Sequence, residues 1–255
     1  MDLIKCRSGV KCISILLFLC FVVRPAASEP QKVGAISFLI GGPGDVLIKK
    51  TSTDKWKDAS LKMDLFEKDV IKTGAEARVE ILLLDQSVLR IGENSELELT
   101  KGIVEKTSKE IQADLKTGRV WANVTKLTGK NDQFQIKAPT AVCAVRGTIY
   151  RIDADSVTTL LVYDGEIDVG PLSLASQPQQ PQQPRSLKPV EVPPPHEIPP
   201  PYEVTLEEWI RIVQGYQVTV RSDKKYEKKK IDDEKDSKLD WVMWNRARDN
   251  QINRN

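Results

Sequence analysis

The sequence predicts a mainly β protein in which short strands form a sandwich-like or solenoid-like domain. Apolar and polar residues alternate in several short segments, as in Glu96–Leu99, which is the pattern of a half-buried strand. Turn residues recur about every 8–12 residues, and no helical periodicity appears before Gly170. Apolar runs such as Ile81–Leu84 further predict strands covered on both faces. No repeat of fixed length is present, so both arrangements stay open.

The first 28 residues have the pattern of a secretory signal peptide. Three basic residues precede an apolar run of 12 residues, Cys12–Val23, and small residues follow as far as Ser28. We expect cleavage after Ser28 and an exported protein in the periplasm, either secreted or associated with the envelope. An uncleaved membrane anchor is the alternative, but 12 apolar residues fall short of the roughly 20 that span a bilayer.

Composition and charge argue against several functional classes. The 255 residues are 40% hydrophobic and 29% charged, as in an ordinary soluble globular protein. Without the first 28 residues the chain holds 34 basic and 35 acidic residues, so no basic face for nucleic acid is expected. Cys143 is the one cysteine beyond the predicted signal peptide, so the sequence predicts no disulfide, no metal site and no cofactor.

A lead-in over residues 29–33 precedes the predicted β domain, which spans residues 34–170. The Gly41–Gly44 segment indicates a turn rather than a phosphate-binding loop, because no Gly-Lys-Ser/Thr sequence follows it. Beyond this turn, each apolar or alternating segment predicts a strand. The expected strands cover residues 45–49, 70–71, 79–84, 88–91, 97–99, 111–115, 119–124, 134–138, 141–145, 149–152, 158–162 and 166–169.

The segment Phe134–Tyr150 lies at the centre of this pattern. It holds two short apolar strands joined by Ala-Pro-Thr and closed by an Arg-Gly-Thr turn. We take Arg146 and Thr148 as candidate binding residues at an edge of the domain. The alternative is a tight turn, in which Gly147 supplies backbone freedom and Arg146 serves as an ion-pair partner.

The order of several short motifs along the chain is more specific than any one of them. These motifs are Trp56, Asp69-Val70-Ile71-Lys72-Thr73, Ala77-Arg78-Val79, Leu84-Asp85-Gln86-Ser87, Leu115–Val120, Ala138–Val142, Arg146-Gly147-Thr148 and Tyr163–Ile167. Together they resemble the FecR domain of bacterial envelope proteins. The resemblance implies an all-β, solenoid-like envelope domain with no catalytic residues.

The resemblance also implies a signalling role, which the start of the chain does not favour. The best-known FecR proteins are inner-membrane regulators of iron uptake, with a cytoplasmic anti-sigma segment and a membrane helix before this domain. Here a predicted signal peptide stands where the anti-sigma segment would be. Because an exported chain cannot reach a cytoplasmic sigma factor, membrane-anchored control of sigma-factor signalling is the less favoured interpretation.

A proline-rich linker separates the predicted β domain from the tail. Residues 171–201 contain 11 of the 15 prolines and five glutamines, a composition typical of an extended spacer. His196, the only histidine, lies inside this linker.

The tail, residues 202–255, is predicted to be part helical and part extended. Thr205 and Glu208 match a capping box, so we expect a helix that Gly215 ends. Residues 216–220 alternate as a strand, residues 221–238 form a solvated charged segment, and a short apolar element begins at Leu239.

Three tryptophans of the tail, Trp209, Trp241 and Trp244, are further candidate binding residues. Either they dock back on the β domain, or they form an exposed patch that anchors a partner or a glycan.

The sequence therefore predicts a non-catalytic binding or protein-interaction module of the periplasm, with a role in envelope sensing. A nucleophilic triad would need His196, which lies in the linker, and the Cys143 side chain lies in an apolar strand. The expected partner is an envelope protein or a cell-wall component, without nucleic acid and without a membrane span after signal cleavage. A structural or peptidoglycan-associated envelope protein is the alternative.

Overall fold

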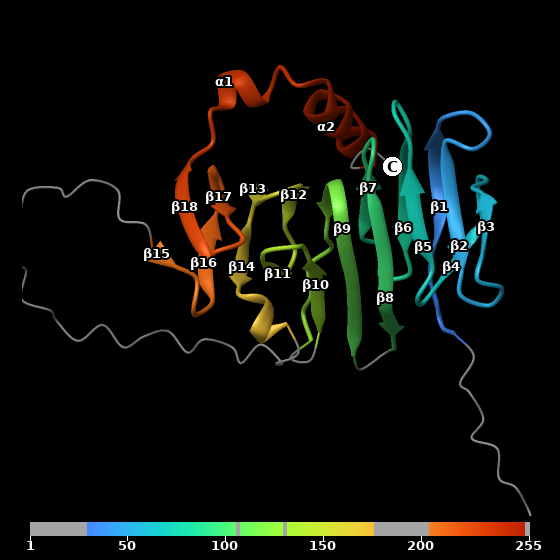
Figure 1. Cartoon of the computed structure of the whole chain (residues 1–255), viewed down its shortest axis with the longest axis horizontal. Helices are drawn as coiled ribbons and strands as arrows, with labels where there is room; N and C mark the ends of the chain where they lie inside the picture. Colours follow the sequence, from blue (N-terminus) through green and yellow to red (C-terminus); the bar gives the residue numbers. More distant parts are fainter. Residues whose placement is uncertain (1–29, 106–107, 130–131, 176–203, 253–255) are drawn as a thin grey trace, which may run out of the picture.

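The computed structural model describes residues 30–105, 108–129, 132–175 and 204–252, which fold into two packed layers of strands (Figure 1). The predicted signal peptide and most of the predicted linker lie outside the described residues, and their prediction stays untested. Within the described ranges, no helix is long and apolar enough to cross a membrane.

The first layer, sheet A, contains ten strands and carries the site described below. Its order in space is β4 (Asp64–Phe66), β1 (Lys32–Ile40), β6 (Arg78–Leu83), β7 (Val88–Ile91), the second part of β9 (Lys109–Asn123), β12 (Ile149–Ala154), β13 (Thr158–Asp164), β17 (Tyr216–Val220), β18 (Lys225–Lys230) and β15 (Val204–Thr205). Every neighbouring pair in this sheet is antiparallel.

The second layer, sheet B, packs against one face of sheet A. Its order is β3 (Lys55–Asp58), β2 (Val46–Lys50), β5 (Val70–Thr73), β8 (Glu96–Val104), the first part of β9, β10 (Gln133–Lys137), β11 (Val142–Val145), β14 (Glu166–Gly170) and β16 (Ile210–Val213). The β9–β10 pair is parallel, whereas the other pairs of sheet B are antiparallel. A short 3₁₀ helix, η1 (Leu172–Leu174), follows β14.

Strand β9 joins the two layers, because its first part pairs in sheet B and its second part pairs in sheet A. Thr117 is the last residue paired with β8, and Gly118 is the first paired with β12. Gly118 has φ of +91°, and a Cβ at this position would lie 2.4 Å from the Cα of Ser95. The crossing therefore requires glycine for both its backbone conformation and its close approach.

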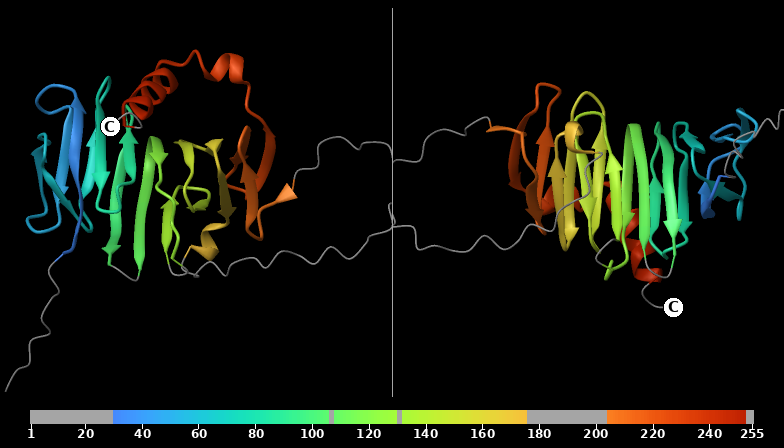
Figure 2. Two further views of the ribbon diagram at one scale, coloured as in Figure 1. Left: turned by 180° about the vertical axis from the view of Figure 1, so that it is seen from behind. Right: turned by 90° about the horizontal axis from the view of Figure 1, so that it is seen from below.

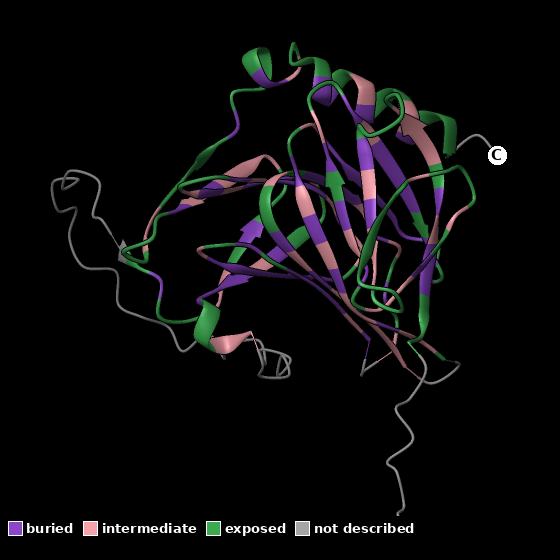
Figure 3. Ribbon diagram, turned by 45° about the vertical axis from the view of Figure 1, so that its right-hand side comes forward, coloured by how far each residue is buried: buried purple, intermediate pink, exposed green. Residues whose placement is uncertain are grey.

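The hydrophobic core fills the space between the sheets. Each strand turns alternate side chains inward, as the alternation in the sequence predicts, and Figure 3 shows buried bands alternating with exposed ones along the strands. Val79 and Ile81 on sheet A and Leu97 and Leu115 on sheet B are fully buried. The mainly β, sandwich-like fold predicted from the sequence is confirmed.

The prediction that Ile81–Leu84 is covered on both faces is wrong. Leu82 and Leu84 are 40% and 42% exposed, because they point away from the core on a part of sheet A with an open outer face. Consecutive apolar residues here reflect one buried face and one partly solvated apolar surface.

The helix predicted from Thr205 to Gly215 is also wrong, because this part of the tail completes the sheets. Ile210–Val213 is strand β16, which pairs with the edge strand β14, and Gly215 turns the chain with φ of +80° into β17. The edge of β14 carries unpaired backbone N–H and C=O groups, and a strand beside it forms a row of hydrogen bonds with them. These bonds stabilise the extended conformation more than the capping box stabilises a helix. The strand predicted over residues 216–220 is confirmed as β17.

The charged segment after residue 220 is more ordered than a solvated linker. It forms β18, which pairs with β17, and then the short helix α1 (Asp233–Asp236). The apolar element expected at Leu239 is the beginning of helix α2 (Asp240–Ile252). We call residues 231–252 the strap, because they run from β18 back across sheet A toward β7 (Figure 2).

Candidate binding groove beneath the C-terminal strap

A row of polar and aromatic side chains crosses the outer face of sheet A. On neighbouring strands, Glu80 of β6 lies directly across from Arg90 of β7, and Arg90 lies across from Trp121 of β9. Trp121 in turn lies across from Arg151 of β12. We call these four residues the outer row. Their neighbours along each strand point into the core, so the outer row points away from it. All four are nevertheless buried, because the strap covers them.

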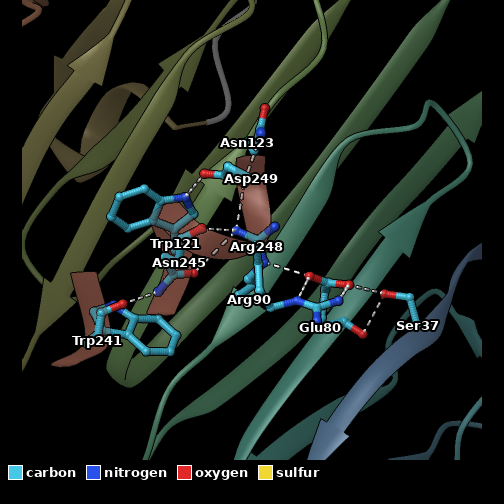
Figure 4. Close-up of polar contacts among 9 residues, drawn as sticks. All are labelled: Ser37, Glu80, Arg90, Trp121, Asn123, Trp241, Asn245, Arg248 and Asp249. Carbon is cyan, nitrogen blue, oxygen red and sulfur yellow. Dashed lines mark hydrogen bonds and ion pairs between the residues drawn. The ribbon is translucent and has the colours of Figure 1, made fainter. Parts of the chain in front are cut away.

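Helix α2 is held on the outer row by buried ion pairs (Figure 4). The Asp249 carboxylate lies 2.7 Å from Arg90 Nη1 and accepts a hydrogen bond of 2.9 Å from Trp121 Nε1. Arg90 Nε lies 2.6 Å from Glu80 Oε2, and Arg248 donates two hydrogen bonds of 2.8 Å to the two Glu80 oxygens. Burial disfavours the charge on Glu80, but the bonds from Arg248 and Arg90 outweigh it and lower the Glu80 pKa to about 2.

Helix α1 is held on the same face by a second buried carboxylate. Asp236 accepts hydrogen bonds of 2.9 Å from Arg151 Nη1 and from the Tyr163 hydroxyl. Arg151 also pairs with Asp153 at 2.9 Å. Burial raises the pKa of Tyr163, and the neighbouring Arg151 opposes that shift. The strap is therefore fixed to sheet A near each of its ends.

The strap arches over the ends of several strands of sheet A (Figure 1). An open groove of about 750 Å³ is lined by residues of the strands, of their turns and of the strap. The sheet supplies most of its lining, and the strap supplies Leu239, Asp240 and Trp241. The residues that line it from the sheet are Arg78, Glu93, Asn94, Thr117, Gly118, Arg119, Arg151, Asp153, Ala154, Asp155, Val157 and Thr159. This volume is within the range of about 300–1,000 Å³ that small-ligand sites occupy.

The three arginines of the groove differ in how fully they are neutralised. Arg78 pairs with Glu93 at 2.6 Å and also with Asp240, and Arg151 has the two carboxylate partners described above. Arg119 has a single long ion pair to a described residue, 3.9 Å from its Nη1 to Glu93, and its side chain is 45% exposed.

Gly92 fixes the course of the Arg119 side chain. A Cβ at position 92 would lie 2.4 Å from Arg119 Cγ and 2.7 Å from Cδ. The aliphatic part of Arg119 therefore lies across the backbone of Gly92, which places its guanidinium in the groove.

Trp241 forms the strap side of the groove and is 3% exposed. Its ring stacks on Trp244 with a centroid distance of 5.5 Å, and the Arg78 guanidinium carbon lies 5.5 Å from its centre. Its indole Nε1 has no hydrogen-bond partner in the described part of the chain. This buried donor is unsatisfied, and its residue lines the cavity.

The structure brings together two of the five candidate residues chosen from the sequence. Trp241 and Trp244 belong to α2 and stack on each other. Of the two predicted alternatives, Trp241 docks back on the β domain, because it is buried in one cluster with Trp121 of β9. Trp209 is half-buried and packs on Gly170 of sheet B.

Arg146 and Thr148 lie in the turn between β11 and β12. Arg146 is exposed, and the buried Thr148 hydroxyl donates a 2.7 Å hydrogen bond to the Glu166 carbonyl. Gly147 has φ of +83°, as a tight turn requires. Neither residue is among those that line the groove.

Sequence reasoning missed the groove residues Arg119, Asp153 and Asp155, which come from two strands and a turn. One available signal was a charged residue inside an otherwise apolar strand, as in Leu89-Arg90-Ile91. Such a residue indicates an outer face that another part of the chain covers.

The comparison with protein families bears on the class of this domain. The model of the FecR protein family matches residues 69–168. This part of the chain is a FecR domain, as the order of motifs predicts, and it contains β5 to β13 and most of β14. FecR domains are in general non-catalytic domains of regulation or binding. The wider boundaries, residues 34–170, stay a prediction.

Two crystal structures of a candidate anti-sigma factor from Parabacteroides distasonis ATCC 8503 resemble the chain. Each is 14% identical in sequence, with a TM-score of 0.44 over 64% of this chain. The match covers 60% of the length of that protein. No curated protein sequence matches the chain.

Proposed function

We propose that this chain is an exported, non-catalytic FecR-domain protein that binds an envelope component in the groove beneath its strap. The observation that carries the proposal is the groove itself. It is open to solvent, it has the volume of a ligand site, and charged side chains from both the FecR domain and the strap line it.

The electrostatics of the groove favour binding over assembly through an apolar surface. Most of its charges form internal pairs, which hold the side chains in fixed positions. Groups that are fixed in advance bind a ligand with less loss of conformational entropy. The structural alternative, a protein that only assembles in the envelope, gives no role to such a groove.

Cross-linking in living cells tests the proposed site. A photo-reactive amino acid replaces Leu239, which lines the groove and is 48% exposed. The matched control replaces Leu172, which is 38% exposed and lies on η1, outside the groove residues. We expect a distinct adduct from position 239 and none from position 172. Equal labelling at both positions would contradict the groove as the binding site.

The proposed location needs its own test, because it rests on the first 28 residues alone. Cell fractionation with sequencing of the mature N-terminus should find the protein in the periplasm, beginning near Glu29. An uncleaved chain in the membrane fraction would overturn this part of the proposal and restore the membrane-anchored regulator of sigma-factor signalling.

A further inference from the structure

We infer that the groove binds a short free peptide and recognises both of its charged ends, the carboxylate at Arg119 and the ammonium group at Asp155. This inference rests on the proposed function, since it names the ligand class of the same groove.

The internal ion pairs of the groove leave part of its charge without a close partner. Arg78 and Arg151 each have two carboxylate partners. Arg119 is left with its long contact to Glu93. Asp155, exposed in the turn between β12 and β13, has no ion pair or side-chain hydrogen bond to the described residues. One cation and one anion therefore line the same cavity without a close partner.

These two charges suit a dipolar ligand better than a purely anionic or cationic one. An arginine guanidinium binds a carboxylate through two parallel hydrogen bonds, and an aspartate accepts several bonds from an ammonium group. Carboxylates flank Arg119 on both sides, because Glu93 is its ion-pair partner and Asp153 is its cross-strand neighbour. A ligand with several negative charges would be repelled by them.

The groove also offers apolar contact. Leu239 and Val157 line the same cavity and can contact small aliphatic side chains. A peptide combines both features, because it has two opposite charged ends with side chains between them.

Calorimetric titration of the purified full-length mature chain tests the inference. The probes are trialanine, its N-acetylated form, its C-terminal amide and the form blocked at both ends. Because a hydrogen bond to a charged group contributes noticeably more than a neutral one, blocking either end should weaken binding about tenfold or more.

Two variants assign each end to its residue. In Arg119→Ala, trialanine should bind about tenfold more weakly, and the C-terminal amide should cause no further loss. In Asp155→Asn, trialanine should likewise bind about tenfold more weakly, and N-acetylation should cause no further loss. Arg211→Ala is the control, because its side chain is also 45% exposed but lies on β16 of sheet B. It should bind every probe as the parent chain does.

Three results would overturn the inference. The first is equal affinity for free and blocked trialanine. The second is a loss of affinity on blocking one end that is as large in the variant of the residue assigned to that end as in the parent chain. The third is no binding of trialanine. Absence of trialanine binding together with a cross-link at position 239 would reject the peptide and leave the binding function standing. Absence of both would reject the function as well.

Discussion

Replacing Asp249 by alanine tests whether buried ion pairs hold α2 on sheet A. In the parent chain the Asp249 side chain is 8% exposed, and it contacts Arg90, Trp121 and Asn123 at 2.7, 2.9 and 3.0 Å. The substitution leaves the fully buried Arg90 with Glu80 as its ion-pair partner. Removing one member of a buried ion pair costs about 3–5 kcal/mol, which lowers the melting temperature of a domain of this size by about 6–20 °C.

Hydrogen exchange distinguishes loss of the strap from unfolding of the sandwich. Because α2 can leave the sheet while the sandwich stays folded, exchange should accelerate first within residues 240–252. Thermal unfolding followed by circular dichroism gives the total loss of stability.

Asn250→Ala is the matched control, since Asn250 is the exposed neighbour of Asp249 on the same helix. Its effect should stay within about 0.5 kcal/mol. If Asp249→Ala and Asn250→Ala lower the melting temperature equally, the ion pairs do not hold the strap and the reasoning is refuted.

Three further predictions concern pH, the crossing of β9 and the turn near Phe134–Tyr150. The folded-state pKa of Glu80 is lowered from 4.5 to about 2, so its stabilising effect is present above pH 4.5 and is lost as the pH falls toward 2. An acid titration of the melting temperature should show this loss, and Glu80→Gln should flatten the curve. Gly118→Ala should reduce stability in urea more than Gly44→Ala. Both positions have positive φ, +91° and +85°, but a Cβ at Gly44 meets nothing within 4 Å, whereas one at Gly118 meets Ser95. Equal losses would show that φ alone sets the cost. Thr148→Val should cost about 1 kcal/mol through its lost hydrogen bond, and Arg146→Ala less than about 0.5 kcal/mol. The reverse order would contradict the interpretation of these residues as a turn.

The sequence predicted the strands well wherever one face packs against the core. Leu97 and Leu99 alternate with glutamates because only one face of β8 is buried, and Tyr216–Val220 alternates for the same reason. Such a pattern is local, and it survives in the sequence whichever strands lie beside it.

The errors arose where a distant partner decides the local structure. Ile210–Val213 follows a helix start signal, but β14 offers it an open edge. The outer row was missed for a similar reason. Glu80 and Arg90 meet Arg248 and Asp249 across more than 150 residues of chain, a proximity that neither strand pattern nor composition encodes.

The site was less predictable than the fold because five separate segments of the chain build it. Arg119 and Asp155 are binding candidates because the other arginines of the groove, Arg78 and Arg151, already have carboxylate partners. Two of those partners, Asp240 and Asp236, belong to the strap, so the sequence does not reveal them. Trp241 was found from the sequence because tryptophan is uncommon and the tail held three of the five. Its unsatisfied N–H became visible in the structure.

The strap has a consequence for the order in which the chain folds. Its contacts require β6, β7, β9 and β12 side by side, since the outer row draws one residue from each. Docking of α2 must therefore come after sheet A has formed, and it is expected to be the last step. Until then two arginines and a glutamate stand on the outer face of the unfinished sheet. Charge on that face opposes association with other incompletely folded chains. The residues that later anchor the strap therefore also reduce aggregation of the folding intermediate.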